Sequence, residues 1–252
     1  MKSALRLELV LLTLAAALAA AAIPWFTGYF AWSWDALNHH IYLGMTAEHA
    51  RWDLDVIPAN YQSYQYPYLY WPVYRLSLWD TSGAFAGAVW SAFQASLLLP
   101  PVWYLCHRLL PAEGAVFSLW LERSVGCLLA FTSLVVLTGL ETTANDLLAA
   151  VPLLWALVLA TRLPGTPASA ALAAALLGAA AAFKLSNGLF LPLLLVWLWV
   201  PHGPVLPWRR ALLLGAGYAA GFGLLYAPWG WQLWRVTGNP FYPYLAHYFG
   251  GP

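Results

Sequence analysis

The chain has 252 residues, of which 62% are hydrophobic and 8% charged, and its mean hydropathy is +0.66. Soluble domains carry about 25% charged residues, so 11 basic and 10 acidic side chains cannot cover a water-exposed surface of this size. This composition excludes a soluble enzyme and a disordered chain, and the net charge of +1 excludes binding of nucleic acid through a basic surface. The composition therefore predicts a polytopic membrane protein with the lipid bilayer as a partner.

Apolar runs along the chain predict about seven transmembrane helices, each requiring about 20 mostly apolar residues. The runs cover residues 7–26, 84–105, 124–140, 147–161, 167–183, 188–200 and 211–229. Two of them, 147–161 and 188–200, are short, and we expect them to be tilted or broken. The predicted fold class is all-α, a membrane helical bundle forming a single module over residues 1–252.

The distribution of charge predicts that the N-terminus lies in the cytoplasm, because most Lys and Arg residues then face inward. Four basic residues fall on the outer side in this arrangement: Arg51, Arg75, Lys184 and Arg235. The first span also resembles a cleavable signal peptide. However, its apolar run continues through Trp25 and Phe26 without a polar cleavage region, so we expect an uncleaved anchor.

Polar residues concentrate in the first outer segment, residues 27–82, which we expect to contain amphipathic helices lying on the membrane surface. On one such helix Asp35, Asn38, His39 and Tyr42 share a face at the spacing i, i+3, i+4, i+7. The carboxylate and imidazole of Asp35 and His39 can hydrogen-bond to each other or share a divalent metal. A surface carboxylate beside a satisfied histidine is the alternative interpretation.

An aromatic stretch follows, in which Tyr61, Tyr64 and Tyr66 are interleaved with Gln62 and Gln65. Tyrosine and tryptophan are typical of the boundary between membrane and water. Alternating rings and amides also suit a wall that binds a polyhydroxylated ligand. Both interpretations hold if the ligand itself sits at that boundary.

Ionisable groups near the apolar slab are costly and indicate function. Asn145 and Asp146 join the third and fourth spans, and Lys184 and Asn187 separate the fifth and sixth. We expect Lys184 to pair with Asp146 or with a ligand phosphate, or else to extend to the membrane surface.

Residues 231–244 are predicted to form a turn followed by an aromatic and proline-rich segment near the same surface. Arg235 in this segment either reaches an anionic headgroup or phosphate, or anchors the chain at the interface.

Together these segments resemble the GT-C superfamily of membrane glycosyltransferases, which use polyprenyl-phosphate-linked sugars. The resemblance rests on Asp35 soon after the first span and on five strings: DALNHHIY at 35–42, PANYQSY at 58–64, TAND at 143–146, FKLSN at 183–187 and TGNP at 237–240. It implies a multi-pass protein of the bacterial inner membrane that transfers a sugar at the extracytoplasmic face with inversion.

The resemblance also implies roles for individual residues. Asp35 corresponds to the general base, with His39 beside it. The leaving phosphate requires a cationic or metal clamp, and Lys184 is favoured over Arg51, Arg75 and Arg235 because it is closest to the apolar slab. The residues expected to contact substrate are Asn38, Tyr42, Tyr61, Gln62, Tyr64, Tyr66, Asn145, Asp146 and Asn187.

Two features depart from the family pattern. Ala36 follows Asp35 where many members have a second acid, which leaves a requirement for a divalent metal open. Family members are also usually longer, so we expect a truncated product, half of a split enzyme or a minimal form.

Two other functions are alternatives to a glycosyltransferase: a flippase or transporter component for lipid-linked saccharides, and a non-catalytic homologue. The sequence shows no inverted repeat of the kind found in transporters.

Overall fold

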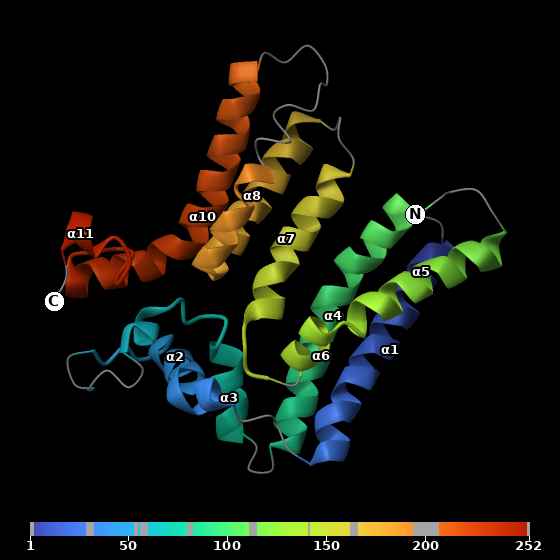
Figure 1. Cartoon of the computed structure of the whole chain (residues 1–252), viewed down its shortest axis with the longest axis horizontal. Helices are drawn as coiled ribbons and strands as arrows, with labels where there is room; N and C mark the ends of the chain where they lie inside the picture. Colours follow the sequence, from blue (N-terminus) through green and yellow to red (C-terminus); the bar gives the residue numbers. More distant parts are fainter. Residues whose placement is uncertain are drawn as a thin grey trace.

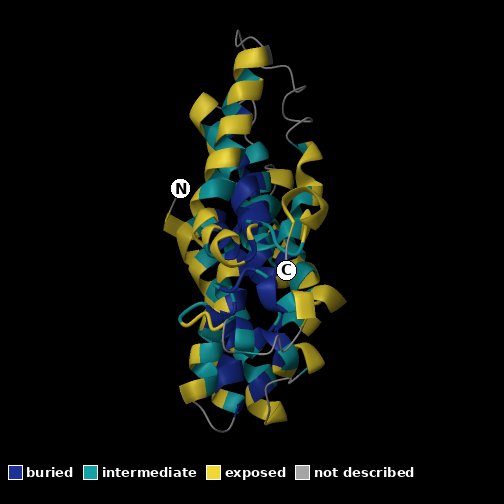
Figure 2. Cartoon of the chain, turned by 90° about the vertical axis from the view of Figure 1, so that its left-hand side faces the viewer, coloured by how far each residue is buried: buried dark blue, intermediate teal, exposed yellow. Residues whose placement is uncertain are grey.

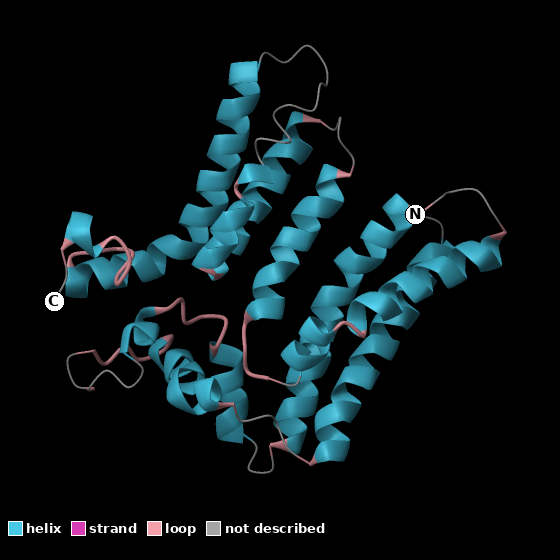
Figure 3. Ribbon diagram, in the orientation of Figure 1, coloured by secondary structure: helices cyan, strands magenta, loops and turns pink. Residues whose placement is uncertain are grey.

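The computed structural model describes residues 3–28, 33–52, 55, 60–79, 83–110, 115–140, 142–161, 166–193 and 207–250. Within these ranges every element is a helix, as Figure 3 shows. In chain order the elements are α1 (Ser3–Thr27), η1 (Ala36–His40), α2 (Ile41–Thr46), η2 (Asn60–Tyr64), α3 (Trp71–Trp79), α4 (Ala84–Leu109), α5 (Val116–Phe131), α6 (Leu134–Leu140), α7 (Asp146–Ala160), α8 (Pro167–Phe183), η3 (Leu185–Phe190), α10 (Pro207–Thr237) and α11 (Ala246–Phe249). The predicted all-α fold class is confirmed.

Three of the described helices are long and apolar enough to cross a membrane: α1, α4 and Trp208–Thr237 of α10. The pair α5 and α6 passes the same test together but bends by 67°, as a broken span or a re-entrant loop does. The apolar helices α7 and α8 have 15 and 17 residues, which corresponds to roughly 22 and 26 Å of length and falls short of a bilayer core of about 30 Å. The structure therefore indicates a membrane protein, and the count of seven spans stays a prediction.

Three predicted boundaries need correction or fall outside the described part. The run 124–140 is not one helix, because the Thr132 and Ser133 hydroxyls bond to carbonyl oxygens of the preceding turn, where α5 ends. The turn predicted from residue 231 begins only at Gly238, whose positive φ of 72° ends α10 after Thr237. Most of the run 188–200 lies outside the described residues.

The long helices lie side by side in Figure 1, with α1 packed on α4, α8 packed on α10, and α7 between α4 and α8. Buried positions follow the middle of the molecule and exposed positions cover its outside, as seen in Figure 2. Large apolar side chains stand on the exposed face of α1, including Leu7, Leu11, Leu14 and Leu18. An apolar outer surface is what a lipid-facing helix requires.

A buried ion pair joins α1 to α5. The Arg123 guanidinium donates two hydrogen bonds to the Glu8 carboxylate, at 2.7 Å from Nε and 2.6 Å from Nη2. Trp103 of α4 donates a third bond to Glu8 at 2.8 Å. These contacts hold α1 against α4 and α5. The uncleaved anchor itself stays a prediction.

We expect Glu8→Gln to lower the free energy of unfolding by about 3–5 kcal/mol, because it leaves the Arg123 charge unpaired in a buried site. Thermal unfolding of the purified protein in detergent measures this loss. Glu122→Gln is the control, since Glu122 contacts only the exposed Ser118 hydroxyl among its described hydrogen bonds. The double variant Glu8→Met with Arg123→Met should recover most of the stability. A Glu8→Gln protein as stable as wild type would contradict the structural role of the pair.

Helices α8 and α10 approach closely at small residues, among them Gly217 and Gly221, which are four positions apart on α10. A Cβ atom on Gly221 would lie 1.9 Å from the Ala175 carbonyl oxygen, and one on Gly217 would lie 2.5 Å from that of Ala171. Such distances are far inside van der Waals contact. The two backbones therefore touch, and these glycines are required by packing.

Substitution of Gly221 by leucine should force α8 and α10 apart and lower stability by about 3 kcal/mol or more, beyond the usual cost of overpacking. Gly223→Leu on the same helix is the matched control, because nothing lies within 4 Å of its added Cβ. Thermal unfolding of both variants tests the expectation. Equal melting temperatures would show that the close approach contributes nothing.

Candidate functional site

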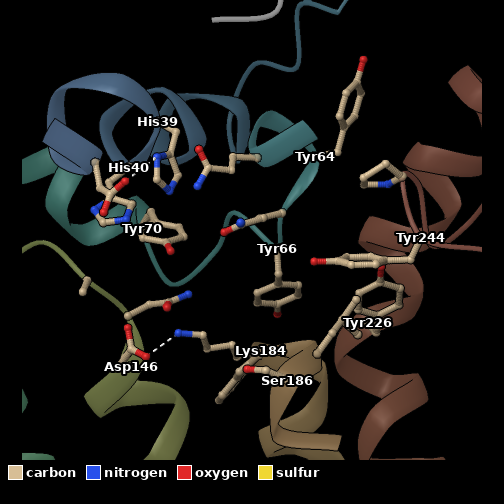
Figure 4. Close-up of a pocket in the computed structure, with 18 of the residues that line it drawn as sticks. His39, His40, Tyr64, Tyr66, Tyr70, Asp146, Lys184, Ser186, Tyr226 and Tyr244 are labelled. Carbon is tan, nitrogen blue, oxygen red and sulfur yellow. Dashed lines mark hydrogen bonds and ion pairs between the residues drawn. The ribbon is translucent and has the colours of Figure 1, made fainter. Parts of the chain in front are cut away.

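A cavity of about 320 Å³ lies where the helices of the 27–82 segment meet the start of α7, the end of α8, and α10 with the segment that follows it (Figure 4). It collects residues that are far apart in the sequence. Eight of the residues predicted as site residues line it: Asp35, His39, Gln62, Tyr64, Tyr66, Asn145, Asp146 and Lys184. The tertiary structure thus brings the predicted acid, imidazole, cation and tyrosines together at one place.

The helix that begins the site is wound differently from the prediction. Residues Ala36–His40 form a π-helix, in which the Ile41 amide donates to the Ala36 carbonyl five residues earlier. In this wider turn, residues four and five apart share a face, so Asp35, His39 and His40 all line the cavity. The predicted face assumed an α-helical period, and this assumption is wrong for this turn.

Two residues of the predicted face consequently do not line the cavity. Asn38 is absent from its wall, and the Tyr42 hydroxyl instead donates to Asp55 Oδ2 at 3.4 Å. Burial and the nearby Asp55 charge raise the pKa of Tyr42 to about 12. Tyr42 therefore stays a neutral donor that ties α2 to the following segment.

His39 is the most deeply buried polar group of the cavity wall, with 3% of its surface exposed. Its Nδ1 atom lies 3.7 Å from Asp35 Oδ1, and no described residue accepts or donates a hydrogen bond there. Burial lowers the pKa of His39, and the Asp35 charge only partly opposes this shift. The imidazole is therefore neutral at pH 7 and has one ring nitrogen without a protein partner, beside a carboxylate that is 53% exposed.

His40 connects this helix to the loop before α7, a role that the sequence analysis missed. Its Nδ1 lies 2.6 Å from the buried Thr143 Oγ1, and its ring stacks on Tyr70 at a centroid distance of 4.6 Å. Burial, assisted by the adjacent His39, lowers the pKa of His40 to about 3. His40 is therefore neutral, and its contacts with Thr143 and Tyr70 fix the position of the neighbouring His39. Two consecutive histidines are visible in the sequence, but both line the cavity only because this turn is a π-helix.

The loop that carries Asn145 and Asp146 is held by buried polar side chains of α4. Trp90 Nε1 donates to the Thr142 carbonyl at 2.9 Å, and Ser91 Oγ donates to the Leu140 carbonyl at 2.6 Å. These bonds satisfy carbonyl groups that the end of α6 leaves without a helical partner. They place the first turn of α7 against the cavity.

The predicted pairing of Lys184 with Asp146 is confirmed. Lys184 Nζ donates to Asp146 Oδ1 across the cavity floor, as the dashed line in Figure 4 marks. The backbone of Lys184 is extended between α8 and η3, which directs the side chain toward α7. The side chains remain 37% and 57% exposed, so this ion pair is accessible to a ligand in the cavity.

The other predicted cations do not line the cavity. Arg51 pairs with Asp55 at 3.2 Å, and Arg75 pairs with Glu48. Arg235 lines a separate groove of about 520 Å³. Within the described residues Lys184 is thus the predicted cation that reaches the cavity.

Asn187 and Tyr61 also lie outside the cavity wall. The Asn187 amide donates to the carbonyl oxygens of Ala149 and Ala180, at 3.2 and 3.1 Å, and so links α7 to α8. Tyr61 is 53% exposed. We therefore assign Asn187 a structural role between α7 and α8. Tyr61 has no role in the cavity.

Tyrosine rings form much of the remaining wall, as Figure 4 shows for Tyr66, Tyr226 and Tyr244. Burial raises the pKa of Tyr66 to about 12, so its hydroxyl stays protonated. Tyr226 and Tyr244 were not predicted as site residues. Tyr226 lies on α10, within the predicted span, whereas Tyr244 reaches the cavity because the chain turns back after α10 ends at Thr237.

The described residues offer little for a metal ion. Among them no three His, Cys, Asp or Glu side chains come together as a ligand set. Asp35 and His39 supply two groups, whereas zinc sites use at least three protein ligands. A divalent metal shared by Asp35 and His39 stays an open alternative from the sequence, and no chemistry is assigned to it.

The cavity combines an accessible carboxylate, a buried neutral imidazole, a paired lysine and several protonated tyrosines. Such a combination suits a ligand with hydroxyl groups and one negative charge. Comparisons with protein-family models, with curated proteins and with solved structures find no match to this chain.

Proposed function

We propose that the protein is a membrane glycosyltransferase that moves a sugar from a polyprenyl-phosphate-linked donor to an acceptor at the extracytoplasmic face. The observation that carries this proposal is the convergence of Asp35, His39, Lys184 and the tyrosines on one cavity. A scaffold would not need these groups to meet, because dispersed polar residues anchor a protein equally well.

The placement of the cavity supports an extracytoplasmic site. It lies at the end of the molecule where α8 ends and α7 begins, whereas the N-terminal end of α1 lies at the opposite end of the helices in Figure 1. With the N-terminus in the cytoplasm, as the distribution of Lys and Arg predicts, the cavity opens to the other side. A polyprenyl phosphate in the outer leaflet presents its sugar at the boundary between the membrane and the extracytoplasmic water.

Asp35 is suited to act as the general base. Its carboxylate takes the proton from the acceptor hydroxyl while that oxygen forms a bond to the anomeric carbon. The bond between the anomeric carbon and the donor phosphate oxygen breaks at the same time, and the electron pair leaves on the phosphate. His39 lies beside Asp35 with a free ring nitrogen and positions the acceptor hydroxyl or the carboxylate.

Lys184 is suited to stabilise the departing phosphate. In the ligand-free site it is paired with Asp146, and a donor phosphate would exchange with this carboxylate as the lysine's partner. Gln62 and the protonated tyrosines supply hydrogen bonds to sugar hydroxyls, and their rings contact the apolar sugar faces.

The proposal is tested by mass spectrometry of surface glycans and lipid-linked sugars in a strain that lacks the gene. A glycosyltransferase predicts that the surface glycan loses a sugar while its polyprenyl-phosphate donor accumulates. A flippase predicts loss of the whole glycan, with its lipid-linked saccharide trapped in the cytoplasmic leaflet. Unchanged glycans and donor levels would support the non-catalytic alternative and refute the proposal.

A further inference from the structure

We propose that the groove between α3 and α4 is a binding site for a bilayer phospholipid of the phosphatidylethanolamine type. Its phosphate would contact Arg75, its ammonium group Glu48, and one acyl chain would lie along α4. This site is separate from the cavity and stands independently of the proposed glycosyl transfer.

The groove has a volume of about 540 Å³ and is lined mainly by apolar and aromatic side chains. Trp71 and Trp79 of α3 form one side, and Val89 and Phe93 of α4 form the other. Trp79 is 81% exposed. Because α4 is a candidate membrane span, a groove on its outer surface opens toward lipid.

An apolar stripe continues from the groove along α4. Phe85, Val89, Phe93 and Leu97 follow one another at intervals of four residues and share one face of the helix. All four are large and exposed. Twelve residues of helix extend roughly 18 Å, which offers an extended acyl chain a continuous apolar track.

A pair of opposite charges stands at the edge of this groove. Arg75 Nε and Trp71 Nε1 both donate to Glu48 Oε1, and the Arg75 guanidinium lies over the Trp71 ring at 5.9 Å from its centroid. The pair with Glu48 uses Nε, so the guanidinium still has the N–H donors of its two terminal nitrogens. The Arg75 side chain is 54% exposed, so these donors are accessible to an incoming phosphate.

The charges select the headgroup. A guanidinium binds a phosphate diester through two parallel hydrogen bonds. Glu48 beside it attracts a cation that can donate hydrogen bonds, which a primary ammonium does and a trimethylated ammonium does not. The groove also contains Trp71 and Trp79, and tryptophan is enriched at the depth of the lipid headgroups. A zwitterionic phosphoethanolamine therefore complements Arg75 and Glu48 together, whereas a purely anionic headgroup complements only Arg75.

The full chain, purified and reconstituted in vesicles, would be exposed to phosphatidylethanolamine that carries a photoreactive group on its acyl chain. Mass spectrometry then locates the labelled peptides. We expect labelling concentrated on residues 85–97, and a decrease of roughly tenfold in Arg75→Gln, which loses one charge-assisted contact. Arg209→Gln is the matched control, because Arg209 also lies over a tryptophan ring, Trp208, but outside this groove.

A second variant, Val89→Trp, fills the groove from α4 without touching the charged pair, and it should block labelling equally. Probes with phosphatidylcholine or phosphatidylglycerol headgroups should label these residues several-fold less. Labelling spread evenly over the exposed faces of α1, α4 and α10, or unchanged in both Arg75→Gln and Val89→Trp, would overturn the site. Equal labelling by the three headgroups would overturn the assignment to phosphatidylethanolamine.

Discussion

Asp35→Asn is expected to abolish sugar transfer, with a loss of about 10³-fold or more, while expression and membrane insertion stay unchanged. The carboxamide has the same size as the carboxylate but cannot take the proton of the acceptor hydroxyl. The Asp35 side chain is 53% exposed and does not contribute to a buried ion pair, so the fold does not depend on its charge. The measurement is the rate of release of polyprenyl phosphate by the purified protein, with thermal unfolding recorded in parallel.

Asp55→Asn provides the control for this experiment. Asp55 lies on the same segment of the chain and pairs with Arg51, but it does not line the cavity. This variant should retain most of the wild-type rate. An Asp35→Asn protein that transfers sugar at the wild-type rate would refute the assignment of Asp35 as the base, whatever reaction the cavity supports.

Lys184→Gln should weaken donor binding and raise the KM for the donor by roughly 10- to 100-fold, because a charge-assisted hydrogen bond to phosphate is lost. A lower kcat is expected as well if the contact strengthens as charge builds on the leaving phosphate. Initial rates at varied donor concentration separate the two effects. The same substitution leaves Asp146 without its partner, so part of the loss reflects repulsion between its carboxylate and the phosphate.

The variant Asp146→Asn isolates the role of the ion pair. It frees Lys184 from its partner and removes a negative charge from the cavity, so the donor KM should fall or stay unchanged. The double variant Lys184→Gln with Asp146→Asn should recover part of the affinity lost by Lys184→Gln alone. If Asp146→Asn raises the KM as much as Lys184→Gln does, the ion pair itself is the functional unit and phosphate exchange at Lys184 is wrong.

Several properties were predictable because they depend on local composition. The apolar runs at 7–26, 84–105 and 167–183 correspond closely to α1, α4 and α8, since continuous apolar sequence favours a helix whatever surrounds it. The pairing of Lys184 with Asp146 was also predictable, because unpaired charges near an apolar slab are costly.

Other properties depended on contacts between distant segments. Arg51 and Arg75 were candidates for the phosphate clamp beside the favoured Lys184, but the structure pairs them with neighbouring carboxylates outside the cavity. His40 reached the site through one turn of π-helix, which hydrophobic periodicity does not reveal. The bonds from Trp90 and Ser91 to the loop before α7 join residues about 50 positions apart.

The sequence by itself determined that this is an all-helical chain with the apolar character of a membrane protein, because hydropathy acts residue by residue. Only the tertiary structure decided which of its polar groups share a cavity. That outcome depends on the winding of one short helix, on which partner each charge finds, and on where α10 ends, and each of these is settled by packing between segments that the sequence leaves far apart.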